Sequence, residues 1–419
     1  MRTIVIAGTL FDGTRDAPTS GQAIVVEDGR IQTVVPAAQI RPQEGDQVLD
    51  CSEHFVLPGL IDSHVHLAFA ARPDHTTTRA ALEGDSRDGS VLRQLHNAQE
   101  CLLAGITTVR DCGGRDLTSF ALRDAVAAGL VVGPRILAGG QPITTTGGHL
   151  HFCQRRADSV AEVRRAVRSL IEAGADFIKV MATGGNMTPG SNPAQPQYRQ
   201  EELDALVEDA HRLGRRVAAH VGAVEGIRRC LLAGVDTLEH GNWLQPDGTV
   251  GYDPAVAELW VRQGAYLGLA VAGYDRLNLR RDRFADAAAH HDALVALYRK
   301  YAPFRALRAA GVPIMVSSDA GVRLTPFRHF WLSLQAYSFA MEVSAAETLR
   351  GATSVAAAGL GLDAEVGVVV PGKRADLLVV AGDPLSDLSD LSRVHLVLCD
   401  GRVVVEDGRL VAPAAGALS

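Results

Sequence analysis

The sequence has few cysteines and lacks any long apolar run. Six cysteines occur among 419 residues, and no two of them form a Cys-x-x-Cys pair. A thiolate zinc site is therefore unsupported, and buried, reduced thiols are the expectation. No apolar stretch approaches the roughly 18 residues of a membrane-spanning helix, and the first residues do not have the pattern of a secretion signal. We predict a cytoplasmic protein without a membrane partner.

An excess of charge of one sign is also absent. The chain carries 41 basic and 48 acidic residues, a formal net charge of −7. This balance gives no electrostatic reason to expect nucleic acid as a partner. Hydrophobic residues make up 47% of the chain, which is enough for a folded core and argues against disorder. The 14 histidines outnumber the cysteines, so imidazole and carboxylate are the expected ligands of any metal.

The two ends of the chain differ from its middle. Short β-rich runs separated by Asp-Gly and Gly-Arg turns occupy both ends. We predict that residues 1–57 and 366–419 together form one small β-sandwich domain. Residues 58–365 would then be a second domain inserted between them.

The middle alternates short apolar strands with amphipathic helices, several of which end in Ala-Gly, as glycine suits the position that stops a helix. Eight such repeats predict a (β/α)₈ TIM barrel, within the α/β class. The alternative is an open doubly wound sheet, against which counts the absence of a G-x-G-x-x-G after the first strand. The predicted strands are 59–67, 106–111, 135–138, 177–181, 217–220, 237–240, 266–270 and 313–318.

Candidate metal ligands follow four of these strands, at the ends where barrel active sites form. His64 and His66 stand two apart in the first strand, so both side chains point to the same side. A His-x-His pair alone is weak evidence. Here, however, His220, His240 and Asp319 stand at the equivalent ends of three further strands. Four imidazoles and a carboxylate at equivalent positions predict a metal site.

Lys179 stands near the end of the fourth predicted strand, 177–181. Such a lysine can pack its stem and extend its ammonium group outward. An inward position among other cations would be costly unless the charge were changed. A neutral amine can react with CO₂ to give a carbamate, an anionic group whose two oxygens can bridge two metals.

Longer motifs resemble the amidohydrolase superfamily, and the resemblance covers essentially the whole chain. They are Leu57-Pro-Gly-Leu-Ile-Asp-Ser-His-Val-His and Gly372-Lys-Arg-Ala-Asp-Leu-Leu-Val-Val, beside the six candidate ligands. The closer resemblance is to the imidazolonepropionase-like, prolidase-type branch with a carboxylated lysine. It rests on Gly174-Ala-Asp-Phe-Ile-Lys-Val-Met-Ala-Thr-Gly-Gly, Thr146-Gly-Gly-His149 and Gln197-Tyr198.

This resemblance implies two divalent metal ions, usually zinc. His64 and His66 would bind one ion together with Asp319. His220 and His240 would bind the other, and carboxylated (carbamylated) Lys179 would bridge the two. Asp319 would also act as the catalytic group that moves a proton from water to the leaving nitrogen.

Three further residues are candidates for contact with the substrate. His149 is expected to bind substrate or the developing oxyanion, unless it is an ordinary loop histidine. Tyr198 is expected to donate its hydroxyl to a substrate carbonyl or carboxylate. Arg323 is the candidate for a free substrate carboxylate, with a solvated surface arginine as its alternative.

The predicted activity is hydrolysis of a non-cyclic amide by attack of a metal-bridging hydroxide. The substrate would be an N-acyl amino acid or dipeptide (prolidase- or carboxypeptidase-like), or a xenobiotic amide, and we expect a homo-oligomer. One alternative is a mononuclear deaminase or cyclic-imide hydrolase, in which a glutamate would replace Ala223. Another is a non-catalytic scaffold, which would have lost ligands that this chain retains. Esters of phosphate, carbamates and lactones also suit such a hydroxide.

Overall fold

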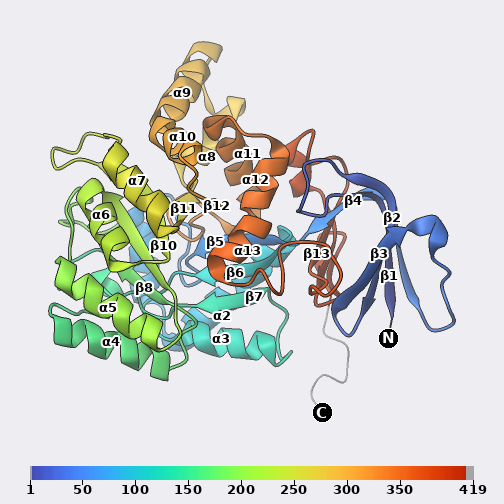
Figure 1. Ribbon diagram of the computed structural model, residues 1–419, viewed down its shortest axis with the longest axis horizontal. Helices are drawn as coiled ribbons and strands as arrows, with labels where there is room; N and C mark the ends of the chain where they lie inside the picture. The colour runs from blue at the N-terminus through green and yellow to red at the C-terminus, as the bar shows by residue number, and fades with distance from the viewer. Residues whose placement is uncertain (1, 412–419) are drawn as a thin grey trace.

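The computed structural model describes residues 2–411 and shows a mixed α/β protein (Figure 1). Both ends of the chain contribute to one eight-stranded sheet, in the order β16-β15-β14-β13-β4-β1-β2-β3. Its N-terminal strands are β1 Thr3–Leu10, β2 Thr19–Glu27, β3 Arg30–Pro36 and β4 Gln47–Pro58. Its C-terminal strands are β13 Leu377–Val380, β14 Val394–Cys399, β15 Arg402–Glu406 and β16 Arg409–Leu410.

The two halves of this terminal sheet meet where β13 pairs antiparallel with the end of β4. Consecutive residues of a strand point to opposite faces, and both faces of β13 are buried. Val5, Ile24, Leu377 and Leu396 come from four different strands and pack in one cluster. Burial of this shared cluster explains why the two chain ends fold together.

Eight parallel strands form the middle of the chain, in two sheets. One sheet has the order β5-β6-β7 and the other the order β12-β11-β10-β9-β8. Each predicted strand is present, with bounds that differ by a few residues at most. The strands are β5 Leu60–Val65, β6 Ile106–Asp111, β7 Arg135–Ala138, β8 Ile178–Met181, β9 Val217–Ala223, β10 Thr237–Leu244, β11 Tyr266–Ala270 and β12 Ile314–Ser317.

Backbone hydrogen bonds join the two parallel sheets at both of their edges. Between β5 and β12, the Asp319 N–H donates to the His64 carbonyl (2.9 Å) and the His66 N–H to the Ala320 carbonyl (2.8 Å). Beside β8, the Ile143 N–H donates to the Lys179 carbonyl (2.8 Å). The strand ends that carry the candidate ligands are thereby held next to one another.

Helices follow the parallel strands and pack outside them, as α4 to α7 do beside β8 to β10 (Figure 1). Their sequences carry helix signals at both ends: the Ser159 side chain caps α4, and Gly234 ends α6 in the left-handed conformation. The helices are α1 His75–Gly84, α2 Arg87–Leu103, α3 Thr118–Ala127, α4 Val160–Glu172, α5 Gln200–Arg212, α6 Val224–Ala233, α7 Pro254–Gln263, α8 Tyr274–Leu277, α9 Ala287–Lys300, α10 Ala302–Ala309, α11 Phe330–Met341, α12 Ala345–Gly351 and α13 Ser354–Leu360.

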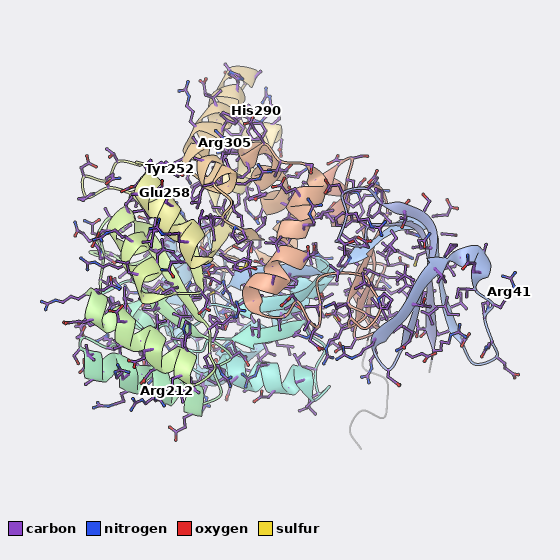
Figure 2. All side chains as sticks on the ribbon, viewed as in Figure 1. Arg41, Arg212, Tyr252, Glu258, His290 and Arg305 are labelled. Carbon is purple, nitrogen blue, oxygen red and sulfur yellow. The ribbon has the colours of Figure 1, made fainter. Side chains whose placement is uncertain are left out.

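The surface is polar, and the apolar material lies between the layers. Figure 2 shows the labelled side chains of Arg212 and Glu258 projecting outward from helices, and that of Arg41 from the loop between β3 and β4. Within residues 2–411, no helix combines the length and the apolarity that a bilayer crossing needs. The largest apolar cluster joins the parallel strands to the helices around them.

Candidate metal centre

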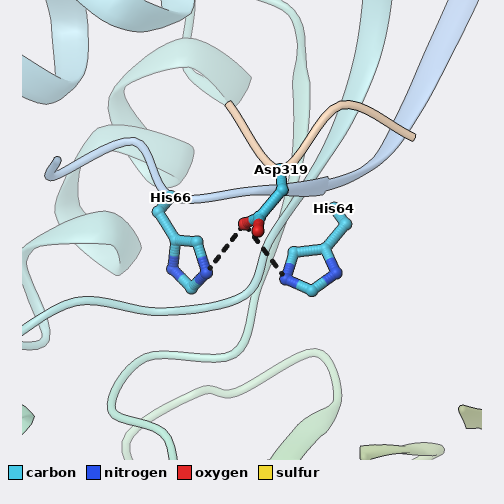
Figure 3. A group of neighbouring side chains, drawn as sticks. All are labelled: His64, His66 and Asp319. Atoms are coloured by element: carbon cyan, nitrogen blue, oxygen red, sulfur yellow. Dashed lines mark ion pairs between the residues drawn. The ribbon is translucent and has the colours of Figure 1, made fainter. Parts of the chain in front are cut away.

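Three predicted ligands lie together where β5 and β12 end (Figure 3). The Asp319 carboxylate oxygen Oδ1 is 3.6 Å from His64 Nε2 and 3.5 Å from His66 Nε2. The other nitrogen of each ring is already bonded: Nδ1 of His66 lies 2.7 Å from the Gly113 carbonyl, and Nδ1 of His64 lies 3.0 Å from Glu239. Each Nε2 is therefore free to face a ligand beside Asp319.

His220 and His240 extend this cluster along the neighbouring strand ends. The ring centroids of His64 and His240 are 5.0 Å apart, and those of His220 and His240 are 4.7 Å apart. His240 and Asp319 both have a positive φ, of 70° and 55°. Such a conformation is uncommon outside glycine, and here it occurs at two candidate ligands, one in β10 and one just after β12.

The electrostatic surroundings keep the histidines neutral. Burial lowers the pKa of His66 to about 4 and lowers the pKa of His64 well below its usual value, with the positive charge of Lys179 acting in the same direction. Burial, followed by neighbouring histidines and Lys179, also lowers the pKa of His220 and His240. Neutral imidazole is the form that binds metal.

Lys179 lies near these histidines, since its charge acts on the pKa values of His64, His66, His220 and His240. Its side chain is fully buried, and its Nζ has no hydrogen-bond partner among the described residues. The Asp319 Oδ1 atom is buried without a hydrogen-bond partner too. Burial raises the pKa of Asp319 to about 7, while the positive charge of Lys179 opposes the rise.

The donor atoms of these residues suit divalent cations. An unpartnered buried amine among four neutral imidazoles is unfavourable, whereas its carbamate would be an anionic ligand. Imidazole and carboxylate donors suit zinc, and also manganese, cobalt and iron. The residues present therefore fit a metal site. A bound metal would also explain why Lys179 Nζ and Asp319 Oδ1 are buried without a hydrogen-bond partner among the described residues.

Two buried residues of the site have no place in the predicted set. Arg110, the penultimate residue of β6, donates from Nη2 to Glu239 Oε1 at 2.5 Å. Glu239 precedes His240 in β10 and is fully buried. The only sequence signal for Arg110 is a charged residue inside an otherwise buried strand.

His149 also lies at this cluster. Its ring centroid is 4.5 Å from that of His220, and its Nδ1 is 3.2 Å from Thr188 Oγ1. Gly185 leaves room for the ring, because a Cβ atom there would come within 2.6 Å of it. Burial, followed by the neighbouring charge of His220, lowers the pKa of His149 well below its usual value.

The structure does not bring Tyr198 or Arg323 into the cluster. Tyr198 is buried in the main apolar core, where its hydroxyl donates to the Ala157 carbonyl at 3.1 Å. A tyrosine with that partner is a core residue, so we leave it out of the proposed machinery. Arg323 lies in the loop after β12, with its guanidinium 5.5 Å from the Tyr274 ring centroid.

Parallel strands that carry histidines, a lysine and an aspartate near their carboxyl ends define a class of hydrolases with a mixed α and β architecture. The chain belongs to the amidohydrolase family, whose model matches residues 55–404. It is similar to an ochratoxinase of Aspergillus niger, with 28% identity over 92% of this chain and 82% of the relative. An imidazolonepropionase of Rhizorhabdus wittichii is 26% identical over 85% of this chain and 87% of its own.

Among solved structures, a Xaa-Pro dipeptidase with methionine bound in its active site superposes with a TM-score of 0.82. The two chains are 29% identical, and the match covers 96% of this chain and 99% of the dipeptidase. The predicted resemblance to the imidazolonepropionase-like and prolidase-type branch is therefore confirmed. The protein is a hydrolase that acts on carbon–nitrogen bonds.

Proposed function

We propose that the protein is a binuclear metal-dependent hydrolase that cleaves a non-cyclic amide bond. One observation carries the proposal: Lys179 Nζ is buried with no hydrogen-bond partner among the described residues, and its charge acts on the pKa values of four histidines and Asp319. A structural lysine would have an acceptor or reach solvent. A carboxylated lysine bridging two cations accounts for both the burial and the missing partner.

The proposal includes the architecture that holds this centre. The eight parallel strands form one (β/α)₈ barrel, spanning residues 58–365, and the terminal sheet folds over as a β-sandwich built from residues 2–57 and 366–411. Residues 1 and 412–419, which the sequence also assigns to that domain, lie outside the described residues. Backbone hydrogen bonds at both seams of the parallel sheets support the barrel. The apolar cluster shared by β1, β2, β13 and β14 supports the sandwich.

The proposed ligands divide between two cations. His64, His66 and Asp319 would hold one, His220 and His240 would hold the other, and carboxylated Lys179 would be a ligand shared by the two. When bound, such ions would supply Lewis acidity and lower the pKa of a water molecule. Neutral histidines and the proximity of Asp319 to both His64 and His66 support this division.

The remaining steps belong to side chains of this chain. Asp319 takes a proton from water and delivers it to the leaving nitrogen. His149 donates a hydrogen bond to the substrate carbonyl oxygen as negative charge develops there. Arg323 receives a free carboxylate on the substrate.

The proposed substrates are N-acyl amino acids, dipeptides of prolidase type, or xenobiotic amides. Support comes from similarity to the Xaa-Pro dipeptidase and to the ochratoxinase, each over most of its length. All of these substrates present a linear amide carbonyl to the same centre. The loops after β5, β8 and β12 surround that centre and are expected to select among them.

The test is a hydrolysis screen on zinc-loaded protein, using dipeptides, N-acyl amino acids and aryl amides. We expect release of a free amino acid or amine from at least one linear amide, and loss of that activity in Lys179→Ala. The exposed Lys300 offers the matched control, Lys300→Ala, which should retain activity. Release of ammonia from heterocycles, with no cleavage of linear amides, would contradict the proposal and favour a deaminase.

A further inference from the structure

Arg110 and Glu239 form a buried ion pair that contacts the proposed metal ligand His64. Metal binding by these two residues does not explain the pair. Arg110 is 3% exposed and Glu239 is fully buried. Burying two charges is unfavourable unless both are fully bonded, so such a pair needs a reason. Its contacts lead to His64.

Both oxygens of Glu239 are occupied, each on a different side. Oε2 lies 3.0 Å from His64 Nδ1. Oε1 accepts from Arg110 Nη2 at 2.5 Å and from Thr237 Oγ1 at 2.8 Å. A carboxylate that already faces a guanidinium and a hydroxyl acts as an acceptor, so the proton between Glu239 and His64 belongs to His64 Nδ1.

Arg110 is itself held from three directions. Its Nε donates to the Ser63 carbonyl at 2.6 Å, and its Nη1 donates to Thr237 Oγ1 at 2.9 Å. Its guanidinium lies over the Phe177 ring, 5.3 Å from the centroid. Arg110 therefore fixes where the Glu239 carboxylate can lie.

A glycine on the neighbouring strand completes the arrangement. A Cβ atom on Gly268 of β11 would lie 2.1 Å from Glu239 Oε2. That space is therefore reserved for the oxygen that faces His64. Any larger residue at 268 would push the carboxylate away from the imidazole.

We propose that Arg110 and Glu239 are positioning residues that fix the tautomer and the ring orientation of His64. With the proton held on Nδ1, the lone pair of His64 is on Nε2, the atom that faces Asp319. A partner of this kind raises the basicity of a metal-bound imidazole and reduces the ways in which the ring can lie. This inference rests on the proposed function, because it concerns affinity for the proposed metal.

The first test compares zinc affinity in the full-length chain, measured by competition with a chelator. Glu239→Gln keeps the shape of the side chain but loses the carboxylate, and we expect zinc affinity at the His64 site to fall roughly 10–100-fold. Arg135→Met is the matched control. It removes an arginine that bonds Asp376 at 2.5 Å and Asp400 at 2.9 Å, away from the site, and should leave zinc affinity unchanged.

A second variant displaces the carboxylate without altering any charge. Gly268→Ala should lower zinc affinity in the same direction as Glu239→Gln. Gly359→Ala is its control, since a Cβ there would meet the Met315 sulfur at 2.2 Å and not the site. Equal loss in Gly268→Ala and Gly359→Ala would overturn the inference, because general loosening would then explain both.

The third readout is the His64 tautomer, from ¹⁵N NMR of the histidine-labelled, metal-free chain. We expect the Nδ1–H form in the wild type and a mixture of both forms in Glu239→Gln. If the wild type binds no zinc, the proposed function fails, and the tautomer alone decides the inference. If the wild type binds zinc but neither affinity nor tautomer changes in Glu239→Gln, the positioning role is overturned while the proposed function stands.

Discussion

At the scale of single residues, the site depends on imidazoles that stay neutral in a crowded, positively charged environment. His64, His66, His220 and His240 all have lowered pKa values, caused first by burial. In His64, His66 and His220, one ring nitrogen contacts Glu239 or a backbone carbonyl. The other ring nitrogen is then available to bind a metal ion. Burial therefore favours the neutral form of these imidazoles, which is the form that binds metal.

The six candidate ligands could be predicted because each stands at or near the end of a predicted strand, and predicted strands are readable from apolar runs. Arg110 and Glu239 could not, because they are 129 residues apart in sequence and meet only across the interior of the parallel sheets. Tyr198 was predicted to contact the substrate, whereas its hydroxyl donates to the Ala157 carbonyl. A motif gives its position along the chain but not which way its side chain points, and that side chain lies in the core.

His149 gives a residue-scale prediction. Its neutral ring lies beside His220 and is held by Thr188, so we expect His149→Ala to lower kcat/KM roughly 10²–10³-fold without loss of metal. Steady-state kinetics combined with metal analysis measures both quantities. His151→Ala removes a partly exposed histidine two positions along and should change neither. Full activity in His149→Ala would remove His149 from the mechanism.

At the scale of elements, the β5–β12 seam places His64 beside Asp319. Asp62 accepts from the backbone N–H of Ser318 at 3.1 Å and also from the Ser318 hydroxyl. That hydroxyl in turn accepts from the Ala320 N–H at 2.9 Å. The hydrogen bonds of one serine therefore set the spacing of two strands that carry three proposed ligands.

Ser318→Ala tests the β5–β12 seam, with the adjacent Ser317 as the control position. Loss of the hydroxyl leaves the buried Asp62 carboxylate less well bonded, so we expect a lower free energy of unfolding by about 1–3 kcal/mol. Ser317 is the matched control, since its buried hydroxyl has no partner among the described residues. Because a buried hydroxyl without a partner is unfavourable, Ser317→Ala should not lower the free energy of unfolding. Urea denaturation of both variants measures the difference, and equal losses would contradict the seam's role.

The strands themselves were predictable from short apolar runs bounded by glycine. Their ends were less so, since β9 and β10 continue past His220 and His240 to Ala223 and Leu244. These extensions depend on pairing with each other beyond a register shift, which the periodicity of one strand does not contain. The positive φ of His240 lies at that irregularity.

At the scale of the whole molecule, the two chain ends are held together by more than apolar packing. His54 of β4 stacks on His395 of β14, with ring centroids 4.1 Å apart and planes 7° apart. His395 Nδ1 lies 2.8 Å from the Asp407 carboxylate. The sequence predicts that both ends form one domain, but not the strand order that brings these rings together.

This stack predicts a pH dependence of stability. Burial, followed by the charge of His395, lowers the pKa of His54, while Asp407, Glu53 and Asp50 oppose the shift. The unfolded chain then binds a proton more readily than the folded one. The free energy of unfolding should therefore fall as pH drops below about 6.5 and approaches the folded pKa.

His54→Phe keeps a ring against His395 and removes the titration. We expect the unfolding curve of this variant to depend less on pH than that of the wild type between about pH 7 and pH 5. Thermal unfolding at several pH values checks it, with His96→Phe on exposed α2 surface as the control. Parallel pH dependences of wild type and His54→Phe would show that the stack does not titrate.

The central claim is that carboxylated Lys179 joins two cations, and the composition of this chain makes that claim unusually testable. Lys179, Lys300 and Lys373 are its lysines, and the latter two are not buried. Zinc-loaded protein prepared with ¹³C-labelled bicarbonate should show a single carbamate resonance by ¹³C NMR and about two zinc ions per chain. Lys179→Ala should lose the resonance and one zinc, whereas Lys300→Ala should keep both. A wild-type protein that is active with one zinc and no carbamate resonance would contradict the account.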